Sequence, residues 1–160
     1  MMLMIGAPAR AIACAPPISL DIAKGQTLGL VGESGSGKSS LARALLRLEE
    51  IDSGTIRYNG HDITHLAGPD LQSLRKSIQV VLQDPYSALN PRKLVRASIA
   101  EGPIIHGMPK KKAYARAEEL LELTGLSSTA GQRYPHEFSG GQRQRICIAR
   151  ALALEPELLV

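Results

Sequence analysis

Residues 32–39, with the sequence GESGSGKS, decide the fold that this chain is expected to adopt. They match the pattern G-x-x-x-x-G-K-[S/T], in which a glycine-rich loop joins a buried strand to a helix. Both neighbours of the loop are present. Residues 27–31, TLGLV, are apolar on both faces and predict a buried central strand. Residues 38–48 carry leucines at helical spacing and predict the helix.

The residue types in this loop are those that a phosphate-binding site needs. Glycines let the backbone curl so that successive N–H groups face phosphate oxygens, and the following helix adds the positive end of its dipole. Lys38 would supply a point charge to the β and γ phosphates of a nucleotide, and the Ser39 hydroxyl can ligate Mg²⁺. The alternative is a glycine-rich turn that joins a strand to a helix and binds nothing.

A second stretch, FSGGQRQR at residues 138–145, has the features of another anion-binding helix start. Ser139 is followed by Gly140 and Gly141 and then by an apolar helix, which predicts accessible backbone amides at the positive end of that helix. The two stretches lie far apart in the sequence. This separation indicates that the second stretch serves a nucleotide held by a partner chain.

Short apolar runs alternate with helical ones along the chain, which is typical of an α/β fold. Further strands are expected at residues 18–22, 55–58, 78–82 and 158–160. Residues 90–135 contain no strand-like run and predict a helical subdomain inserted in the sheet domain. A last helix is expected to start at Gly140 and Gly141.

The composition of the 160 residues, 44% hydrophobic and 21% charged, excludes a disordered or collagen-like chain. A net charge of +4 permits an anionic ligand and leaves nucleic acid, phosphates and acidic membranes open. Cys14 and Cys147 predict neither a disulfide framework nor a zinc site, and a reducing cytosol fits best. Arg10 and prolines interrupt the apolar start, residues 1–19, so we expect neither an export signal nor a membrane-spanning helix.

The stretch at residues 32–39 resembles the phosphate loop of P-loop nucleotide-binding proteins. The stretch at residues 138–145 is similar to the signature sequence of ATP-binding-cassette (ABC) ATPases, with Phe138 in place of the common Leu. In that family two domains pair head to tail, and the signature of one caps the ATP on the phosphate loop of the other. The resemblance implies that the partner's ATP is contacted by Ser139, Gly140, Gly141 and Gln142.

Gln83 follows an expected strand and resembles the Q-loop glutamine of the same family, which touches Mg²⁺ and the attacking water. A neutral amide at a strand end can ligate a metal and orient water without adding charge. The resemblance implies that Mg²⁺ is held by Ser39 and Gln83. It implies that ATP is bound by Gly32, Glu33, Ser34, Gly35, Ser36, Gly37, Lys38, Ser39, Ser40 and Gln83.

Two further stretches, LQDPYSALNPR at residues 82–92 and RYPHEF at residues 133–138, are similar to the oligopeptide, dipeptide and nickel importer subfamily. The resemblance runs from residue 18 to residue 160. It implies a P-loop α/β core, an inserted helical subdomain with the signature, and an N-terminal antiparallel β portion. The core is expected at residues 18–89 and 141–160, and the subdomain at residues 90–140.

The resemblance also implies a strand after the signature helix, followed by an Asp that holds Mg²⁺ and a Glu that polarises the attacking water. The sequence stops at Val160, before that pair. We therefore expect that the C-terminal part of the core is missing. Such a fragment would hold ATP and would contain no catalytic residue, and Gln83 would only orient water.

The leading interpretation is the ATP-binding subunit of a peptide or nickel importer, bound peripherally at the cytoplasmic face of the membrane. Its implied partners are a second ABC ATPase subunit, membrane permease subunits and, indirectly, an extracytoplasmic solute-binding protein. One alternative is a non-hydrolysing nucleotide-binding module or a pseudogene-like fragment. Another is a soluble ABC protein that acts on DNA or the ribosome. The importer-like stretches argue against this last alternative, so no nucleic acid partner is expected.

Overall fold

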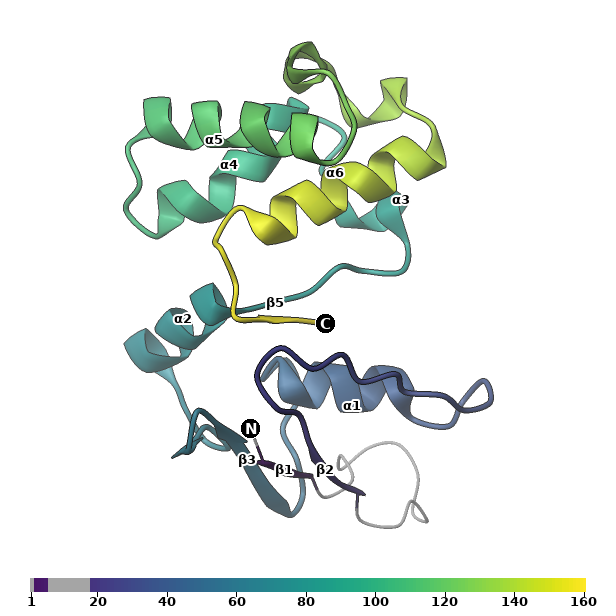
Figure 1. Cartoon of the computed structure of the whole chain (residues 1–160), viewed down its shortest axis with the longest axis vertical. Coiled ribbons are helices and arrows are strands. Elements are labelled where there is room, and N and C mark those ends of the chain that lie inside the picture. The colour runs from purple at the N-terminus through teal and green to yellow at the C-terminus, as the bar shows by residue number, and fades with distance from the viewer. Residues whose placement is uncertain (1, 6–17) are drawn as a thin grey trace. The chain divides into compact units, whose positions relative to one another are not determined.

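The computed structural model describes residues 2–5 and 18–160 of the chain (Figure 1). The chain divides into two compact units, Met1–Ser73 and Leu74–Val160. The boundary between them falls within helix α2 (Gly68–Ser77). Most of the apolar start, including Cys14, lies outside the described residues.

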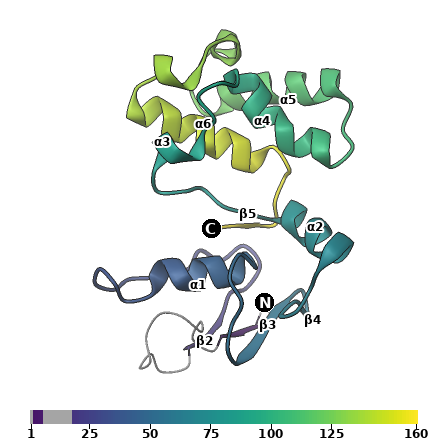
Figure 2. The ribbon, with the colours of Figure 1, turned by 180° about the vertical axis from the view of Figure 1, so that it is seen from behind.

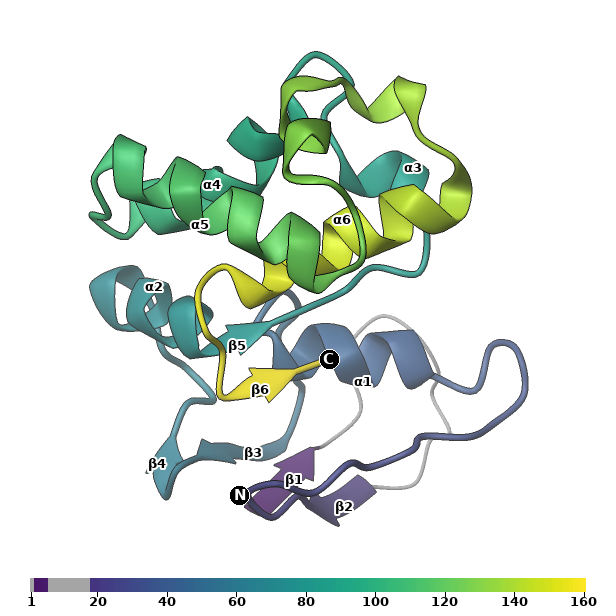
Figure 3. The same cartoon turned by 45° about the horizontal axis from the view of Figure 1, so that its top comes forward.

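Unit 1 is built on an antiparallel sheet with the strand order β2-β1-β3-β4 (Figure 3). The strands are β1 (Met2–Ile5), β2 (Ile18–Asp21), β3 (Gly54–Tyr58) and β4 (His61–Asp62). The strands expected at residues 18–22 and 55–58 are confirmed, and so is the antiparallel β portion. Strand β1 was not predicted, yet it pairs with both β2 and β3, with Leu3 opposite Leu20 and Ile56.

A two-residue turn closes the hairpin of β3 and β4. Asn59 and Gly60 both have positive φ angles, 50° and 80°, as a type I′ turn requires. The Ile56 amide donates to Thr64 Oγ1 at 2.8 Å, and the Ile56 side chain is 1% exposed. This hairpin therefore contributes a buried side chain to the core of unit 1, together with Ile63 beyond the turn.

Helix α1 (Lys38–Leu45) confirms the helix expected after the glycine-rich loop, although it ends three residues earlier than residue 48. Leu41 and Ala44 face the interior, whereas Leu48 lies beyond the helix and is exposed. The basic residue Arg43 stands in the last turn, where the negative end of the helix dipole favours it. The loop is thus followed by a helix with one buried face.

The buried strand predicted at residues 27–31 is wrong. These residues form no strand, and Leu28, Leu30 and Val31 are exposed, Val31 at 95%. A strand exists only where a neighbouring strand takes up its N–H and C=O groups. Within the described part of the chain, no strand lies hydrogen-bonded beside this segment.

Unit 2 is mainly helical, as residues 90–135 predicted (Figure 2). Its helices are α3 (Pro85–Ala88), α4 (Val95–Ile105), α5 (Lys110–Leu123), η1 (Ser128–Gln132), η2 (Pro135–Glu137) and α6 (Gly140–Leu152). Helices α4, α5 and α6 enclose an apolar core that includes Ile99, Leu121 and Ile146, all 0% exposed. Phe138 and Cys147 belong to the same core, so the Phe in place of Leu keeps an apolar anchor before α6.

The strands expected at residues 78–82 and 158–160 are shorter than predicted. Strand β5 (Ile78–Gln79) pairs in parallel with β6 (Leu158–Leu159) (Figure 3). Beyond this pairing, the Val81 amide donates to the Val160 carbonyl, and the Val160 amide donates to the Gln79 carbonyl, each at 2.9 Å. Leu159 is 45% exposed. A sheet of two strands leaves an edge on each side. No helix of the described residues is long and apolar enough to span a membrane.

Candidate functional site

The glycine-rich loop of unit 1 enters α1 through two glycines in left-handed conformations. Gly35 has a φ of 83°, and Gly37, the N-cap of α1, has a φ of 89°. Residues with a Cβ pay a steric penalty in this region, so glycine is the natural residue at both positions. The tight curl brings the loop back over the start of the helix.

The start of α1 offers backbone donors. The first helical hydrogen bond runs from the Leu41 amide to the Gly37 carbonyl at 2.9 Å, and no side chain caps the helix. The amides of Lys38, Ser39 and Ser40 therefore have no acceptor within the helix. The first turn contains no acidic residue. This helix end is suited to an anion, because its dipole and its N–H groups act in the same direction.

The Lys38 ammonium lies over the loop. Its Nζ donates to the carbonyl oxygens of Gly32 and Glu33, each at 2.6 Å, and to Ser36 Oγ at 3.2 Å. Glu33 thus takes part in the loop through its backbone, and its carbonyl also accepts from the Ser36 amide. The positive charge is held at the mouth of the loop by neutral oxygens, which phosphate oxygens could replace.

The second stretch forms the N-terminus of α6 in unit 2. Ser139 is the N-cap: its Oγ accepts from the Gln142 amide at 3.3 Å, and Gln142 Oε1 accepts from the Ser139 amide at 3.0 Å. These reciprocal bonds form a capping box. The two side chains expected to contact a partner's ATP are therefore used inside the chain. The spacing S-x-x-Q was the sequence signal for this role, and the prediction missed it.

The two glycines inside the box have little packing reason to be glycine. A Cβ on Gly141 would meet no atom within 4 Å, and a Cβ on Gly140 would lie 3.6 Å from Tyr86 Oη, an ordinary contact. Neither has a positive φ. The absence of side chains leaves their backbone amides accessible at the end of a helix with no acid in its first turn.

Gln83 lies in an exposed bend between β5 and α3, one residue before the cap of α3. That cap is Asp84, whose carboxylate accepts from the amides of Tyr86 at 2.9 Å and Ser87 at 3.3 Å. The bond from the Tyr86 amide, followed by the bonds from Ser87, lowers the pKa of Asp84 below its ordinary 3.8. Gln83 belongs to unit 2, whereas Lys38 and Ser39 belong to unit 1.

The loop before α6 is held by charged side chains. Glu137 accepts from Arg133 Nε at 3.2 Å and from the Tyr134 amide at 2.6 Å, and the amide bond is the larger cause of its lowered pKa. The Arg133 guanidinium lies over the Phe138 ring, 4.5 Å from its centroid. From α6, Arg143 donates to the carbonyls of His136 and Phe138. Sequence reasoning gave Arg133 and Arg143 no role.

A family model described as ABC transporter matches residues 16–160 of this chain. The chain belongs to the ABC transporter family. The resemblance to ABC ATPases in the sequence is thereby confirmed, together with the α/β fold class. The residues assigned to ATP, Mg²⁺ and the partner's nucleotide stay predictions, as do the boundaries of the core and the helical subdomain.

Curated relatives of this ABC-family chain include the glutathione import ATP-binding protein GsiA of Escherichia coli O157:H7. It is 55% identical over 144 residues, which are 89% of this chain and 23% of the relative. The GsiA protein of Shigella boydii serotype 4 matches with the same identity and coverage. The chain thus spans about a quarter of the length of these relatives.

Two solved structures of ABC proteins share the fold. One is the dimeric post-hydrolysis state of the ATP-binding cassette MJ0796 bound to ADP and Pi. Its TM-score is 0.84 at 25% identity, over 99% of this chain and 72% of that chain. The other is cbiO1 from Clostridium perfringens, part of the ABC transporter complex cbiONQ. Its TM-score is 0.80 at 25% identity, over 98% of this chain and 62% of that chain.

Proposed function

We propose that this chain is the ATP-binding part of an ABC importer, and that residues 32–40 hold the phosphates of ATP. The observation that carries the proposal is the position of Lys38 Nζ, 2.6 Å from two loop carbonyls beside the uncapped start of α1. A triphosphate supplies charged oxygens for this ammonium and for the amides of the first turn. Charged acceptors bind such donors more strongly than neutral carbonyls do.

The side chains proposed for Mg²⁺ are Ser39 and Gln83, by the resemblance to ABC ATPases. A hydroxyl oxygen and an amide oxygen are the hard ligands that this ion accepts. When bound, Mg²⁺ neutralises charge on the phosphates. The exposed position of Ser39 in the first turn of α1 agrees with this role. Gln83, exposed in a bend, is proposed to orient the attacking water.

The start of α6 is proposed to contact ATP held by a second ABC subunit in a head-to-tail pair. The contacting residues are taken to be Ser139, Gly140, Gly141 and Gln142. The side chains of Ser139 and Gln142 close the capping box, so we assign the contact mainly to the backbone amides of the two glycines. A related ATP-binding cassette is known as a dimer bound to ADP and Pi.

The transported solute is proposed to be a peptide. Relatives at 55% identity are named for the import of glutathione, a tripeptide, which favours peptides over nickel. The importer-like stretches at residues 82–92 and 133–138 support the same assignment. The partners would be membrane permease subunits and, indirectly, an extracytoplasmic solute-binding protein, with this chain at the cytoplasmic face of the membrane.

We further propose that residues 1–160 by themselves bind ATP without turning it over. Family resemblance assigns the Mg²⁺-holding Asp and the water-polarising Glu to positions after residues 158–160, outside this stretch. Positioning by Lys38 and Ser39 alone supplies no general base. The expected result is saturable nucleotide binding with phosphate release at the rate of ATP in buffer.

Calorimetric titration with Mg-ATP tests the proposal directly. We expect Lys38→Ala to weaken binding at least about tenfold, because a hydrogen bond to a charged group contributes about 1.5–3 kcal/mol. The matched control is Lys24→Ala, which removes the same charge from an exposed turn of the same unit and should leave affinity unchanged. Equal affinity of the Lys38→Ala variant and the original chain would rule out the phosphate site.

A further inference from the structure

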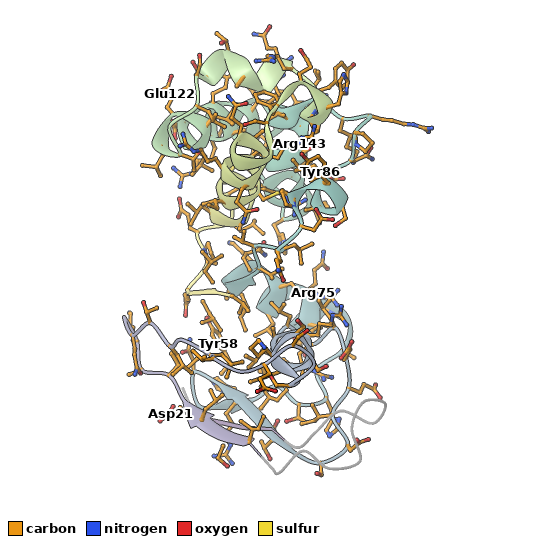
Figure 4. All side chains as sticks on the ribbon, turned by 90° about the vertical axis from the view of Figure 1, so that its right-hand side faces the viewer. Asp21, Tyr58, Arg75, Tyr86, Glu122 and Arg143 are labelled. Atoms are coloured by element: carbon orange, nitrogen blue, oxygen red, sulfur yellow. The ribbon has the colours of Figure 1, made fainter. Side chains whose placement is uncertain are left out.

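Arg143 of α6 joins three segments of unit 2. Its Nε donates to the Phe138 carbonyl at 3.0 Å, and its Nη2 donates to the His136 carbonyl at 3.3 Å. The face of its guanidinium lies on the Tyr86 ring of α3, with Cζ 4.2 Å from the ring centroid. Figure 4 shows Tyr86 and Arg143 side by side. The guanidinium thus uses its edge for the loop before α6 and its face for α3.

Tyr86 is in contact with the start of α6 as well. The position of a Cβ on Gly140 lies 3.6 Å from Tyr86 Oη. Tyr86 itself is 63% exposed, so its ring is not a core residue placed by burial. Its backbone is fixed from the other side, because its amide donates to the Asp84 carboxylate directly after Gln83. Tyr86 therefore connects residues 83–86, which we call the Gln83 segment, to the beginning of α6.

The loop that precedes α6 is held in place by contacts of its last residues. Phe138 is buried in the core of unit 2, and Ser139 after it is the N-cap. The carbonyls of His136 and Phe138 in this loop accept hydrogen bonds from the Arg143 side chain, which belongs to the first turns of α6. This back-bonding fixes the direction in which the backbone enters the helix, and so the direction of the first amides.

We infer that Arg143 is a positioning residue for the amides of Gly140 and Gly141, and that its stacking on Tyr86 ties the Gln83 segment to those amides. The inference rests on the proposed function, since that function gives the amides their ligand. The Arg143 guanidinium contacts the loop before α6 and the Tyr86 ring of α3 at the same time. A displacement of the Gln83 segment would therefore be transmitted to the N-terminus of α6 through the Tyr86 ring and the Arg143 side chain.

Amide hydrogen exchange on the full chain, followed by NMR, tests this inference without any nucleotide. The reporters are the Ser139 and Gln142 amides, which the capping box protects, and the Tyr86 amide, which Asp84 protects. Tyr86→Leu should accelerate exchange of the two capping-box amides about two- to fivefold, because an exposed cation–π contact is lost. Tyr86→Phe keeps the ring and should restore the original rates.

A substitution of Arg143 in α6 should in turn affect the backbone at Tyr86 in α3. Arg143→Gln removes the stacking and two charge-assisted bonds, so we expect about tenfold faster exchange at Ser139 and faster exchange at Tyr86. The matched control is Arg145→Gln, an arginine of the same helix that donates to the Gly125 carbonyl at 3.3 Å instead. It should leave all three reporters unchanged.

Two results would overturn the inference. One is unchanged exchange at Ser139 and Gln142 in the Tyr86→Leu variant. The other is equal acceleration at the core amides of Ile99 and Leu121, which would mean general destabilisation of unit 2. Mg-ATP binding by the unaltered chain is measured in parallel. If binding is absent while the reporters respond as expected, the proposed function fails and the positioning role stands.

Discussion

Two glycines of the phosphate-type motifs have different reasons to be glycine. Gly37 stands at a φ of 89° as the N-cap of α1. Gly37→Ala should lower the free energy of unfolding of unit 1 by about 1–2 kcal/mol, the usual cost of a left-handed conformation with a Cβ. Urea unfolding monitored within residues 18–73 measures this. Gly29→Ala is the control: Gly29 has no positive φ and no atom within 4 Å of an added Cβ, so stability should not fall.

Gly141 should behave differently, because it lies in α6 with a helical φ and open space around it. Alanine is the better helix former, so Gly141→Ala should leave unfolding unchanged or stabilise unit 2 by up to about 1 kcal/mol. Its methyl group would stand in the path of a ligand that approaches the amides. Thermal unfolding measures the change in stability, and nucleotide-dependent pairing with a second ABC subunit measures whether the methyl group blocks the proposed contact. A clear loss of stability would show that Gly141 has a structural role.

At the same scale, the glycine-rich loop and the helix that follows it could be predicted from the sequence, and the Tyr86–Arg143 contact could not. The loop is a contiguous motif in which glycine, lysine and serine each have a chemical reason for their place. Tyr86 and Arg143 come from distant parts of the chain, and neither residue type is unusual where it stands. Only the packing of α3 against α6 brings them together.

Among the elements, α3 is an α-helix of only four residues, so the bonds of its N-cap are a large part of its hydrogen bonding. The Asp84 carboxylate accepts two of its amide bonds, and these bonds lower the pKa of Asp84 from 3.8. A lowered pKa in the folded chain means that the stabilisation is complete above 3.8 and is lost as the pH falls through the lower folded value. The α3 segment should therefore loosen in acid.

Asp84→Asn tests this pH dependence, since Asn caps a helix about as well as Asp and does not titrate. Asn has a single acceptor oxygen, which can take the place of Oδ1 toward the Tyr86 amide, so the Tyr86 amide is the reporter. Between about pH 6 and about pH 2, after correction for intrinsic rates, protection of the Tyr86 amide should fall in the original chain and stay constant in the variant. Glu137, whose pKa is also lowered, titrates in both proteins and cancels in the comparison. Identical pH profiles would contradict the assigned cause.

Helices were predicted better than strands, for a physical reason. The apolar spacing that identifies α1 and α6 is a property of a single segment, and so are their capping residues. A strand needs a neighbour, which the segment itself does not specify. Residues 27–31 have strand composition without a paired neighbour, whereas β1 (Met2–Ile5) was not predicted and lies between two others.

At the scale of the whole molecule, each of the two units has buried apolar side chains, such as Ile56 in unit 1 and Leu121 in unit 2. Cys147 is 0% exposed in unit 2, and burial raises the pKa of its thiol, so it should react with thiol reagents only when unit 2 opens. Leu121→Ala should accelerate this labelling at least about thirtyfold, since such core truncations cost about 2–5 kcal/mol. The measurement is made in a Cys14→Ser background.

The control for that experiment comes from the other unit. Ile56→Ala removes a side chain that is 1% exposed in unit 1 and should destabilise residues 18–73 by a comparable amount. If the units open separately, the labelling rate of Cys147 should stay at its original value. Equal acceleration by the two substitutions would mean that the chain unfolds as one cooperative body.

The capping box at the start of α6 also has a kinetic consequence for the proposed pairing of two subunits. Ser139 and Gln142 close it within a single chain. Ordering one residue of free backbone costs roughly 1–2 kcal/mol of entropy, and here that ordering precedes any encounter with a second subunit. For the proposed pairing of two subunits at the start of α6, the association rate should therefore be set by diffusion and orientation rather than by folding of residues 139–142.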